Sequence, residues 1–270
     1  MTALPGMAAA TAGIGSANLA IDAARKLGFS AGLKLCLDAA DAASYPGGTE
    51  QAWSDRSGGG YHFNRGSGSG SDAADPTFNG AAGDLGAYWS FDGGDWFTLG
   101  QANPAWLNSL HKDDAAWWVL AGLYPVVGGG AKSIFGTAVS ASDVGVSLQY
   151  SAAGAAALIV FNGSGSVARQ NNLGTLADQQ WHVLGYSFDE TVGSGGDIRF
   201  INGAVAAGDS TVASPSAANA THTAQIGARN GSVPIASGSR LAFFLAGEGE
   251  ALTAGQMLAF HEATRGRFGI

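Results

Sequence analysis

Apolar and polar residues alternate with a period of two over most of the chain after Gly32. Short alternating runs bounded by Gly, Asn, Asp and Ser are typical of antiparallel strands joined by tight turns. The pattern predicts strands at 33–38, 88–93, 96–100, 116–124, 133–138, 145–151, 157–162, 181–189, 197–203, 223–228 and 240–247. So many strands without intervening helices predict an all-β fold, either a two-sheet sandwich or a barrel.

Helical spacing is found towards the two ends of the chain. Residues 16–28, SANLAIDAARKLG, carry an apolar stripe between Ser16 as N-cap and Gly28 as the stop. Residues 253–265, TAGQMLAFHEATR, follow the cap candidate Thr253. We therefore expect an N-terminal arm and helix at 1–32 and a β domain at 33–270. The sequence leaves open whether the first helix docks on its own domain, on another copy or on a larger assembly.

Composition and charge narrow the classes of partner. The chain has 43 Gly, 46% hydrophobic and only 13% charged residues, which indicates a folded, turn-rich protein. Its net charge of -8 makes nucleic acid and anionic membranes poor partners. Cys36, the single cysteine, excludes an intrachain disulfide and is typical of a buried apolar position. We expect no signal peptide, no membrane insertion and a soluble protein.

The most informative stretch is LADQQWHVLGYSFD at 176–189, followed by DIRFINGAVAA at 197–207. Period two places residues 182, 184, 186 and 188 on one face, and Asn202-Gly203 suits a two-residue hairpin turn. Together the two segments resemble the central motif of laminin G-like domains of the concanavalin A-like jelly-roll superfamily. In that family a Trp-His pair starts the strand, so we interpret Trp181 and His182 as packing residues.

Other segments match the same family in the expected order. They are LDAADAASYPGGTEQAWSDRSGGGYHF, YWSFDGGDWFTL, AWWVLAGLYPVVGGGAKSIFGTA and AQIGARNG, and the resemblance spans about residues 33–265. It implies an antiparallel two-sheet jelly-roll sandwich. The closing helix and GRFGI tail resemble the versions found in bacteriophage structural proteins and related particles, which implies a virion location.

Catalysis is not expected from the sequence. Glycoside hydrolases of this superfamily need two carboxylates about 5–10 Å apart, and in them the acids resemble a Glu-x-Asp-x-Glu strand that this chain lacks. Glu248 and Glu250 form the nearest pair, but AGEGEALT is typical of a turn into the last helix. The segment GFSAG lacks the strand-then-helix context of a nucleophile elbow, and in GGGAKS Ala131 stands where a phosphate loop needs Gly before Lys. The sequence therefore predicts no catalytic residues and no enzyme.

Calcium is the one cofactor that the resemblance implies, because laminin G-like and pentraxin-like relatives often hold it with loop carboxylates. Asp92 and Asp95 in FDGGDWF, or Asp72 and Asp75 in GSGSGSDAADP, are the candidate ligands. The preferred interpretation is that these aspartates form turns without an ion.

Carbohydrate recognition needs aromatic faces and planar polar groups on loops over a rigid sheet. The sequence offers two such groups of candidates: Tyr61, His62, Asn64 and Arg65 in one loop, and Arg229 with Asn230 in another.

These observations favour a non-catalytic carbohydrate-binding module on a phage or phage-like particle that recognises host surface polysaccharide. Residues 1–30 would attach it to other virion proteins, and we expect a homo-oligomer because single glycan sites are weak. The alternative is a structural capsid-decoration or tail protein. A polysaccharide hydrolase is the third and least favoured hypothesis.

Overall fold

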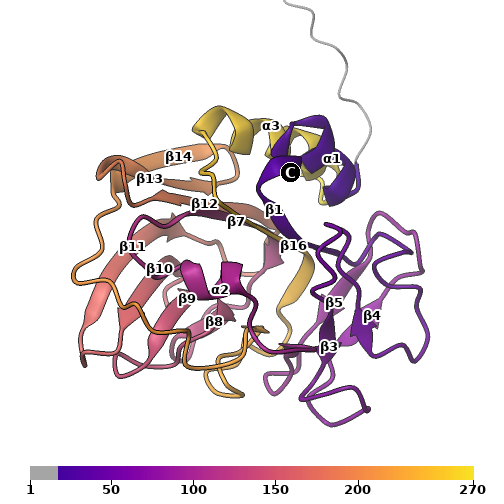
Figure 1. Cartoon of the computed structure of the whole chain (residues 1–270). Coiled ribbons are helices and arrows are strands. Elements are labelled where there is room, and N and C mark those ends of the chain that lie inside the picture. Colours follow the sequence, from indigo (N-terminus) through magenta and orange to yellow (C-terminus); the bar gives the residue numbers. More distant parts are fainter. Residues whose placement is uncertain (1–17) are drawn as a thin grey trace, which may run out of the picture.

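Two antiparallel sheets of eight strands each face one another across a shared core (Figure 1). The computed structural model describes residues 18–270. The first sheet, sheet A, has the order β14-β13-β12-β7-β16-β5-β4, with β1 also paired to β16. The second, sheet B, has the order β11-β10-β9-β8-β15-β6-β3-β2. The predicted all-β, two-sheet sandwich is confirmed.

The strands and helices have the following bounds. Sheet A contains β1 (Leu33–Asp38), β4 (Thr77–Asn79), β5 (Tyr88–Ser90), β7 (Ala116–Tyr124), β12 (His182–Asp189), β13 (Ser194–Ile201), β14 (Ala204–Asp209) and β16 (Arg240–Glu248). Sheet B contains β2 (Ala52–Trp53), β3 (Phe63–Arg65), β6 (Phe97–Leu99), β8 (Lys132–Gly136), β9 (Val144–Tyr150), β10 (Ala155–Asn162), β11 (Val167–Thr175) and β15 (Gln225–Ile226). The helical segments are α1 (Ala20–Lys26), η1 (Phe29–Ala31), α2 (Ala105–Ser109), α3 (Ala254–Thr264) and η2 (Arg265–Arg267).

Each predicted strand has a counterpart, although the segment at 223–228 pairs only over the two residues of β15. The sequence pattern missed β2, β3, β4, β11, β14 and the short helix α2. Strand β11, VARQNNLGT, lacks an apolar alternation because polar side chains point into the sandwich. Strand β14, AVAAGD, is built from small residues with little β propensity.

The main core lies between the two sheets and is rich in aromatic rings. Trp53, Trp89 and Trp117 are fully buried there, and β12 contributes residues 184, 186 and 188. Val183, one position out of step, belongs to a second cluster on the opposite face of sheet A. The alternation predicted for β12 is confirmed.

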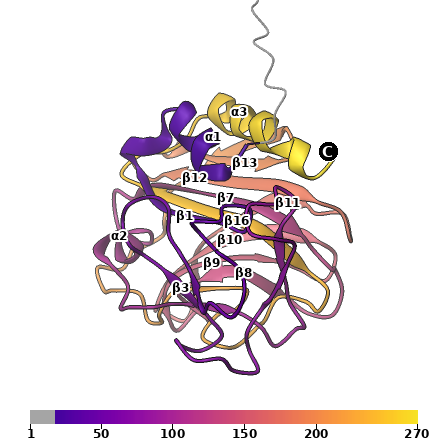
Figure 2. The same ribbon diagram turned by 90° about the vertical axis from the view of Figure 1, so that its right-hand side faces the viewer.

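The outer face of sheet A is covered by α1 and α3 (Figures 1 and 2). Phe29 packs against Trp118 and Phe260 with ring centroids 5.6 Å and 6.1 Å apart. The Trp118 ring packs against Gly247, where a Cβ atom would come within 2.2 Å of the ring, so only glycine fits. Strand β7, AWWVLAGLY, is therefore buried on both faces, which explains its continuous apolar run.

The two long helices match the sequence prediction to different degrees. Helix α3 begins after Thr253, whose side chain and that of Gln256 form the expected capping box. Helix α1 begins at Ala20, so the predicted start at residue 16 is wrong; Ser16 itself lies outside the described residues. No helix within residues 18–270 is long and apolar enough to cross a membrane.

A buried ion pair fastens the C-terminal tail to the sandwich. The guanidinium of Arg267 donates to both carboxylate oxygens of Asp38 at 2.8 Å and 2.9 Å, and neither side chain is exposed. Asp38 also accepts hydrogen bonds from the backbone N–H groups of Ala20 and Ala40. Arg267 donates through Nε to the carbonyl of Leu85. One carboxylate thus joins α1, β1 and the tail.

Replacing Arg267 by Ala should lower the free energy of unfolding by about 3–5 kcal/mol, because the Asp38 carboxylate would stay buried without its counter-ion. Urea unfolding at pH 7 measures this loss. Arg265→Ala removes a neighbouring arginine whose ion pair with Glu262 is exposed, and it should cost less than about 1 kcal/mol. Equal losses in the two variants would contradict the assignment.

Candidate functional site

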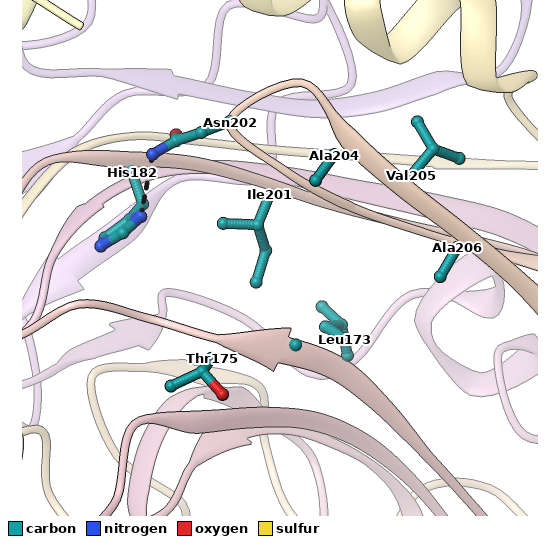
Figure 3. Close-up of a pocket in the computed structure, with 9 residues that line it drawn as sticks. Leu173, Thr175, His182, Ile201, Asn202, Ala204, Val205 and Ala206 are labelled. Atoms are coloured by element: carbon teal, nitrogen blue, oxygen red, sulfur yellow. Dashed lines mark hydrogen bonds between the residues drawn. The ribbon is translucent and has the colours of Figure 1, made fainter.

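A groove opens at the edge of the sandwich where β11 faces β13 and β14 (Figure 3). Its volume is about 360 Å³, within the range of about 300–1,000 Å³ typical of small-ligand sites. The lining comes from the ends of both sheets and from one hairpin. It consists of Leu173, Gly174, Thr175, His182, Ile201, Asn202, Ala204, Val205 and Ala206.

The groove exists because the strands around it carry small residues. Ala204 and Ala206 pair with Ile201 and Arg199 of β13, so they leave space above those side chains. On the opposite wall a Cβ atom at Gly174 would lie 3.2 Å from Cδ1 of Ile201. Within residues 18–270 strand β14 is also the edge of sheet A, so its outer backbone groups have no partner strand, although the carbonyls of Ala207 and Asp209 accept from Arg199 and Arg169. The groove therefore combines an apolar floor with the open backbone edge of β14.

His182 and Asn202 close one end of the groove (Figure 3). Nδ1 of His182 accepts from the side-chain amide of Asn202 at 3.0 Å, and Nε2 donates to the carbonyl of Ala177 at 3.1 Å. Burial lowers the pKa of His182, and these partners suit the neutral ring. Asn202 and Gly203 both have positive φ angles of 47° and 89°, which confirms the predicted hairpin turn. His182 thus supports the groove, as the packing interpretation predicted.

A polar cluster continues from the groove along β11 and β13. Arg199 donates to the carbonyls of Asn172 and Ala207, both at 2.8 Å, and so bridges the two sheets. Asn171 donates to the hydroxyl of Tyr186 at 2.6 Å. Arg169 lies 3.5 Å from the carboxylate of Asp209. These contacts hold β11 against the β13–β14 edge.

Asp197 is the unusual member of this cluster. Its side chain is fully buried and neither oxygen accepts a hydrogen bond within the described residues; Nε of Arg199, 3.4 Å away, is its cation. Burial raises the pKa of Asp197 to about 6, against the opposing effects of Arg199 and Arg169. This pair was not among the residues predicted from the sequence. A signal was present, because in DIRF the charged residues fall on one face and Ile198 and Phe200 on the other.

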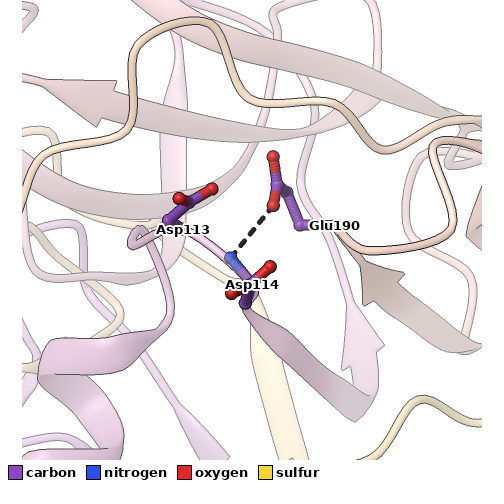
Figure 4. A group of neighbouring side chains, drawn as sticks. All are labelled: Asp113, Asp114 and Glu190. Carbon is purple, nitrogen blue, oxygen red and sulfur yellow. Dashed lines mark hydrogen bonds between the residues drawn. The ribbon is translucent and has the colours of Figure 1, made fainter.

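Three carboxylates form a candidate metal site at the opposite end of β12 (Figure 4). Asp113 and Asp114 precede β7 and Glu190 follows β12, which is the antiparallel neighbour of β7. One oxygen from each residue lies within 4.8 Å of the others, so the group could hold a metal ion. The backbone N–H of Asp114 donates to Glu190 at 3.0 Å, and both aspartates are exposed.

The aspartates predicted as calcium ligands occupy turns. Asp95 is buried and accepts from the backbone N–H of Asp92 at 2.7 Å, and burial raises its pKa to about 7. Asp92 accepts from the N–H of Gly94. Asp72 accepts from the N–H of Ala74 at 2.8 Å, and a hydrogen bond from the Ser67 hydroxyl lowers its pKa. Asp75 lies beside it in the same loop.

The first group of predicted glycan contacts, residues 61, 62, 64 and 65, forms several contacts within the protein itself. The ring of Tyr61 lies 5.7 Å from that of Trp106. His62 accepts through Nδ1 from the N–H of Asp55, and Asn64 lies on β3. Arg65 donates to the carbonyls of Pro76 and Glu50 and lies over the Trp89 ring.

The second group lies elsewhere on sheet B. Asn230 is exposed in a tight turn with a φ of 49°, whereas Arg229 is only 6% exposed, and burial lowers its pKa. The side chain of Arg229 covers Gly136 of β8, and β15 and β6 separate β8 from β3. The structure therefore does not bring the two groups into one pocket. Their contact with glycan stays a prediction.

Comparisons with solved structures show that the fold is a β-sandwich shared with other proteins. Neither a protein-family model nor a curated protein sequence matches the chain. Among solved structures, Trypanosoma rangeli sialidase in complex with sialic acid is 12% identical with a TM-score of 0.55, over 87% of this chain and 33% of that one. The binding domain of botulinum neurotoxin DC in complex with SialylT is 10% identical (TM-score 0.57), over 87% and 52%. Domain 4 of AbnA, a GH43 arabinanase from Geobacillus stearothermophilus, in complex with arabinotriose, is 14% identical (TM-score 0.55), over 85% and 98%.

These likenesses bear on the expectation that the chain is not an enzyme. That expectation is corrected by these structures, because they belong largely to a sialidase and an arabinanase and the fold therefore gives no ground for excluding catalysis. This chain spans about a third of the sialidase chains. At such low identity the comparisons establish the fold alone.

The buried carboxylate of Asp197 should make stability depend on pH. Its folded pKa of about 6 exceeds the unfolded value of about 3.9, so between these values the folded state binds more protons and its stability falls as pH rises. The free energy of unfolding of Asp197→Asn should therefore gain about 2 kcal/mol relative to the wild type between pH 4 and pH 8. Urea unfolding across this range measures the gain. Parallel curves for Asp197→Asn and the wild type would refute the assignment.

Proposed function

We propose that this chain is a carbohydrate-binding β-sandwich whose ligand lies in the edge groove. The groove carries the proposal, in a fold shared with lectin-like domains. Support comes from domain 4 of the arabinanase, a domain matched over nearly its whole length that has been observed with arabinotriose. The neurotoxin domain in complex with SialylT is a second likeness of this kind.

The chemistry of the groove suits a neutral sugar. Leu173 and Ile201 offer an apolar floor for the C–H face of a ring. The Thr175 hydroxyl and those backbone groups of the β14 edge that no side chain engages offer donors and acceptors to sugar hydroxyls. His182 and Asn202 form hydrogen bonds with each other and with the backbone, which fixes the end wall of the groove.

The narrower predictions from the sequence belong to this proposal. A laminin G-like jelly roll of the type found in phage particles, a virion location and host surface polysaccharide as ligand rest on the motifs at 176–207 and on the closing helix and tail. The alternative of a capsid-decoration or tail protein rests on the same features. Helix α1 already packs its apolar face on the sandwich, so attachment and oligomerisation through residues 1–30 would fall mainly to residues outside the described range.

Filling the groove should abolish sugar binding. Ala206→Trp places a large ring in the groove, and we expect at least a tenfold loss of affinity for neutral oligosaccharides such as arabinotriose in calorimetric titrations. Ala207→Trp is the matched control, because the next residue of β14 points to the opposite face of the strand and should bind as the wild type does. Equal affinity in both variants would place the ligand elsewhere. Sugar release is assayed on the same samples, since similar structures belong to glycosidases.

Calcium stays a prediction from the sequence, and the carboxylate group at Asp113, Asp114 and Glu190 is the better place for it. We expect any heat of binding on titration with CaCl₂ to vanish in Glu190→Gln and to persist in Asp95→Asn. The reason is that Asp95 is buried and already accepts a backbone hydrogen bond, whereas the three carboxylates are accessible together. Loss of the heat in Asp95→Asn alone would favour the turn predicted from the sequence.

A further inference from the structure

A row of aromatic side chains with one arginine crosses four neighbouring strands at one end of sheet A. The strands are β12, β7, β16 and β5, in that order. Trp181 directly precedes β12, Tyr124 ends β7, Arg240 begins β16 and Tyr88 begins β5. Arg240 pairs with Tyr124 in the sheet register. We call these four residues the aromatic row.

The arginine is held between two tyrosine rings. Its guanidinium carbon lies 4.5 Å from the ring centroid of Tyr124 and 4.9 Å from that of Tyr88. Trp181 meets both tyrosines edge-on, with centroids 5.6 Å and 5.9 Å away, and stacks on Phe268 of the C-terminal tail at 4.6 Å. Such cation–π contacts orient the planar guanidinium without using any of its N–H donors.

The N–H donors of Arg240 have no partner among the described residues. Within residues 18–270 the Arg240 side chain forms no hydrogen bond and no ion pair, although it is half-buried. The other arginines near the tail differ, since Arg267 is bound to Asp38 and Arg265 to Glu262. The chain has a net charge of -8, so carboxylates outnumber cationic side chains. An oriented guanidinium without a carboxylate partner among the described residues is therefore unusual in this protein.

The indole of Trp181 is equally distinct from the others. The chain has seven tryptophans, and six of them, Trp53, Trp89, Trp96, Trp106, Trp117 and Trp118, have a buried Nε1. Trp181 is half-buried and its Nε1 is not enclosed. The hydroxyls of Tyr88 and Tyr124 also make no hydrogen bond within the described residues. The row therefore presents N–H and O–H donors beside the half-buried indole of Trp181.

We propose that the aromatic row binds a carboxylate-bearing sugar, such as a uronic or sialic acid. The guanidinium edge of Arg240 takes the carboxylate through two parallel hydrogen bonds, and the indole of Trp181 packs against the C–H face of the ring. The aromatic row shares no residue with the lining of the edge groove, and the inference rests on the proposed function only in taking carbohydrate as the class of ligand. The positive charge of Arg240 makes the aromatic row selective for an acidic sugar, because the edge groove has no comparable unpaired cation among the described residues.

Calorimetric titration of the full chain with digalacturonate, 3′-sialyllactose and neutral lactose tests the proposal. We expect binding of one or both acidic sugars, which tells the two sources apart, and a weaker response to lactose. Arg240→Gln should lower the affinity for the acidic sugar at least tenfold, and Arg240→Lys should lower it nearly as much because it keeps the charge but not the planar fork. Arg25→Gln, on the exposed side of α1, removes the same charge elsewhere and should leave the affinity unchanged.

The groove variant separates this inference from the proposed function. Retention of acidic-sugar binding in Ala206→Trp together with its loss in Arg240→Gln supports the aromatic row. Loss in Ala206→Trp and retention in Arg240→Gln would overturn the row while leaving the groove in place. Equal affinity in Arg240→Gln and Arg25→Gln, no binding of either acidic sugar, or binding of an oligoglutamate peptide in preference to both sugars would also overturn it. Thermal unfolding of each variant checks that it folds.

Discussion

The ion pair between Asp38 and Arg267 is the contact on which the arrangement of sheet A depends. Sheet A is buried on both faces, so something other than sheet B has to cover its outer side. Helices α1 and α3 do this, and they come from opposite ends of the chain. Asp38 joins the first residue of α1, the end of β1 and the C-terminal tail through four hydrogen bonds. A charge buried this deeply is tolerated only with such complete pairing.

Covering one face in this way also decides which surfaces stay open. The helices and tail cover the ends of β5, β7, β12 and β16 only in part, so Trp181 and its neighbours remain half-buried while Trp118, farther along the same face, is fully buried. The tail contributes Phe268 to the stack on Trp181. On the inner face, the edge at β14 stays open because its residues are too small to fill the space above β13. The groove is open where large side chains are absent, whereas the aromatic row is open where the covering elements leave large side chains half-buried.

The sequence predicts the fold well and the sites poorly, for physical reasons. Strands such as β7 and β12 are recognisable because burial demands apolar residues along their length. Strand β11 is not, since Asn171 and Arg169 serve hydrogen bonds across the sandwich edge that only the folded chain brings together. The groove is defined by alanines, and small residues carry no chemical signal. The aromatic row is drawn from residues 88, 124, 181 and 240, which only the strand order makes neighbours.

The two surfaces differ in how much of their polar capacity the protein itself consumes. Along the groove, His182, Asn202, Arg199 and Arg169 are all engaged by protein partners, so a charged ligand would have to break contacts that hold β11 in place. Its remaining donors and acceptors are a hydroxyl and backbone groups, which match neutral hydroxyls. At the aromatic row the guanidinium is oriented by ring faces and keeps its donors. The energetic cost of orienting it has been met during folding, and an anion gains the full benefit of a fixed, planar partner.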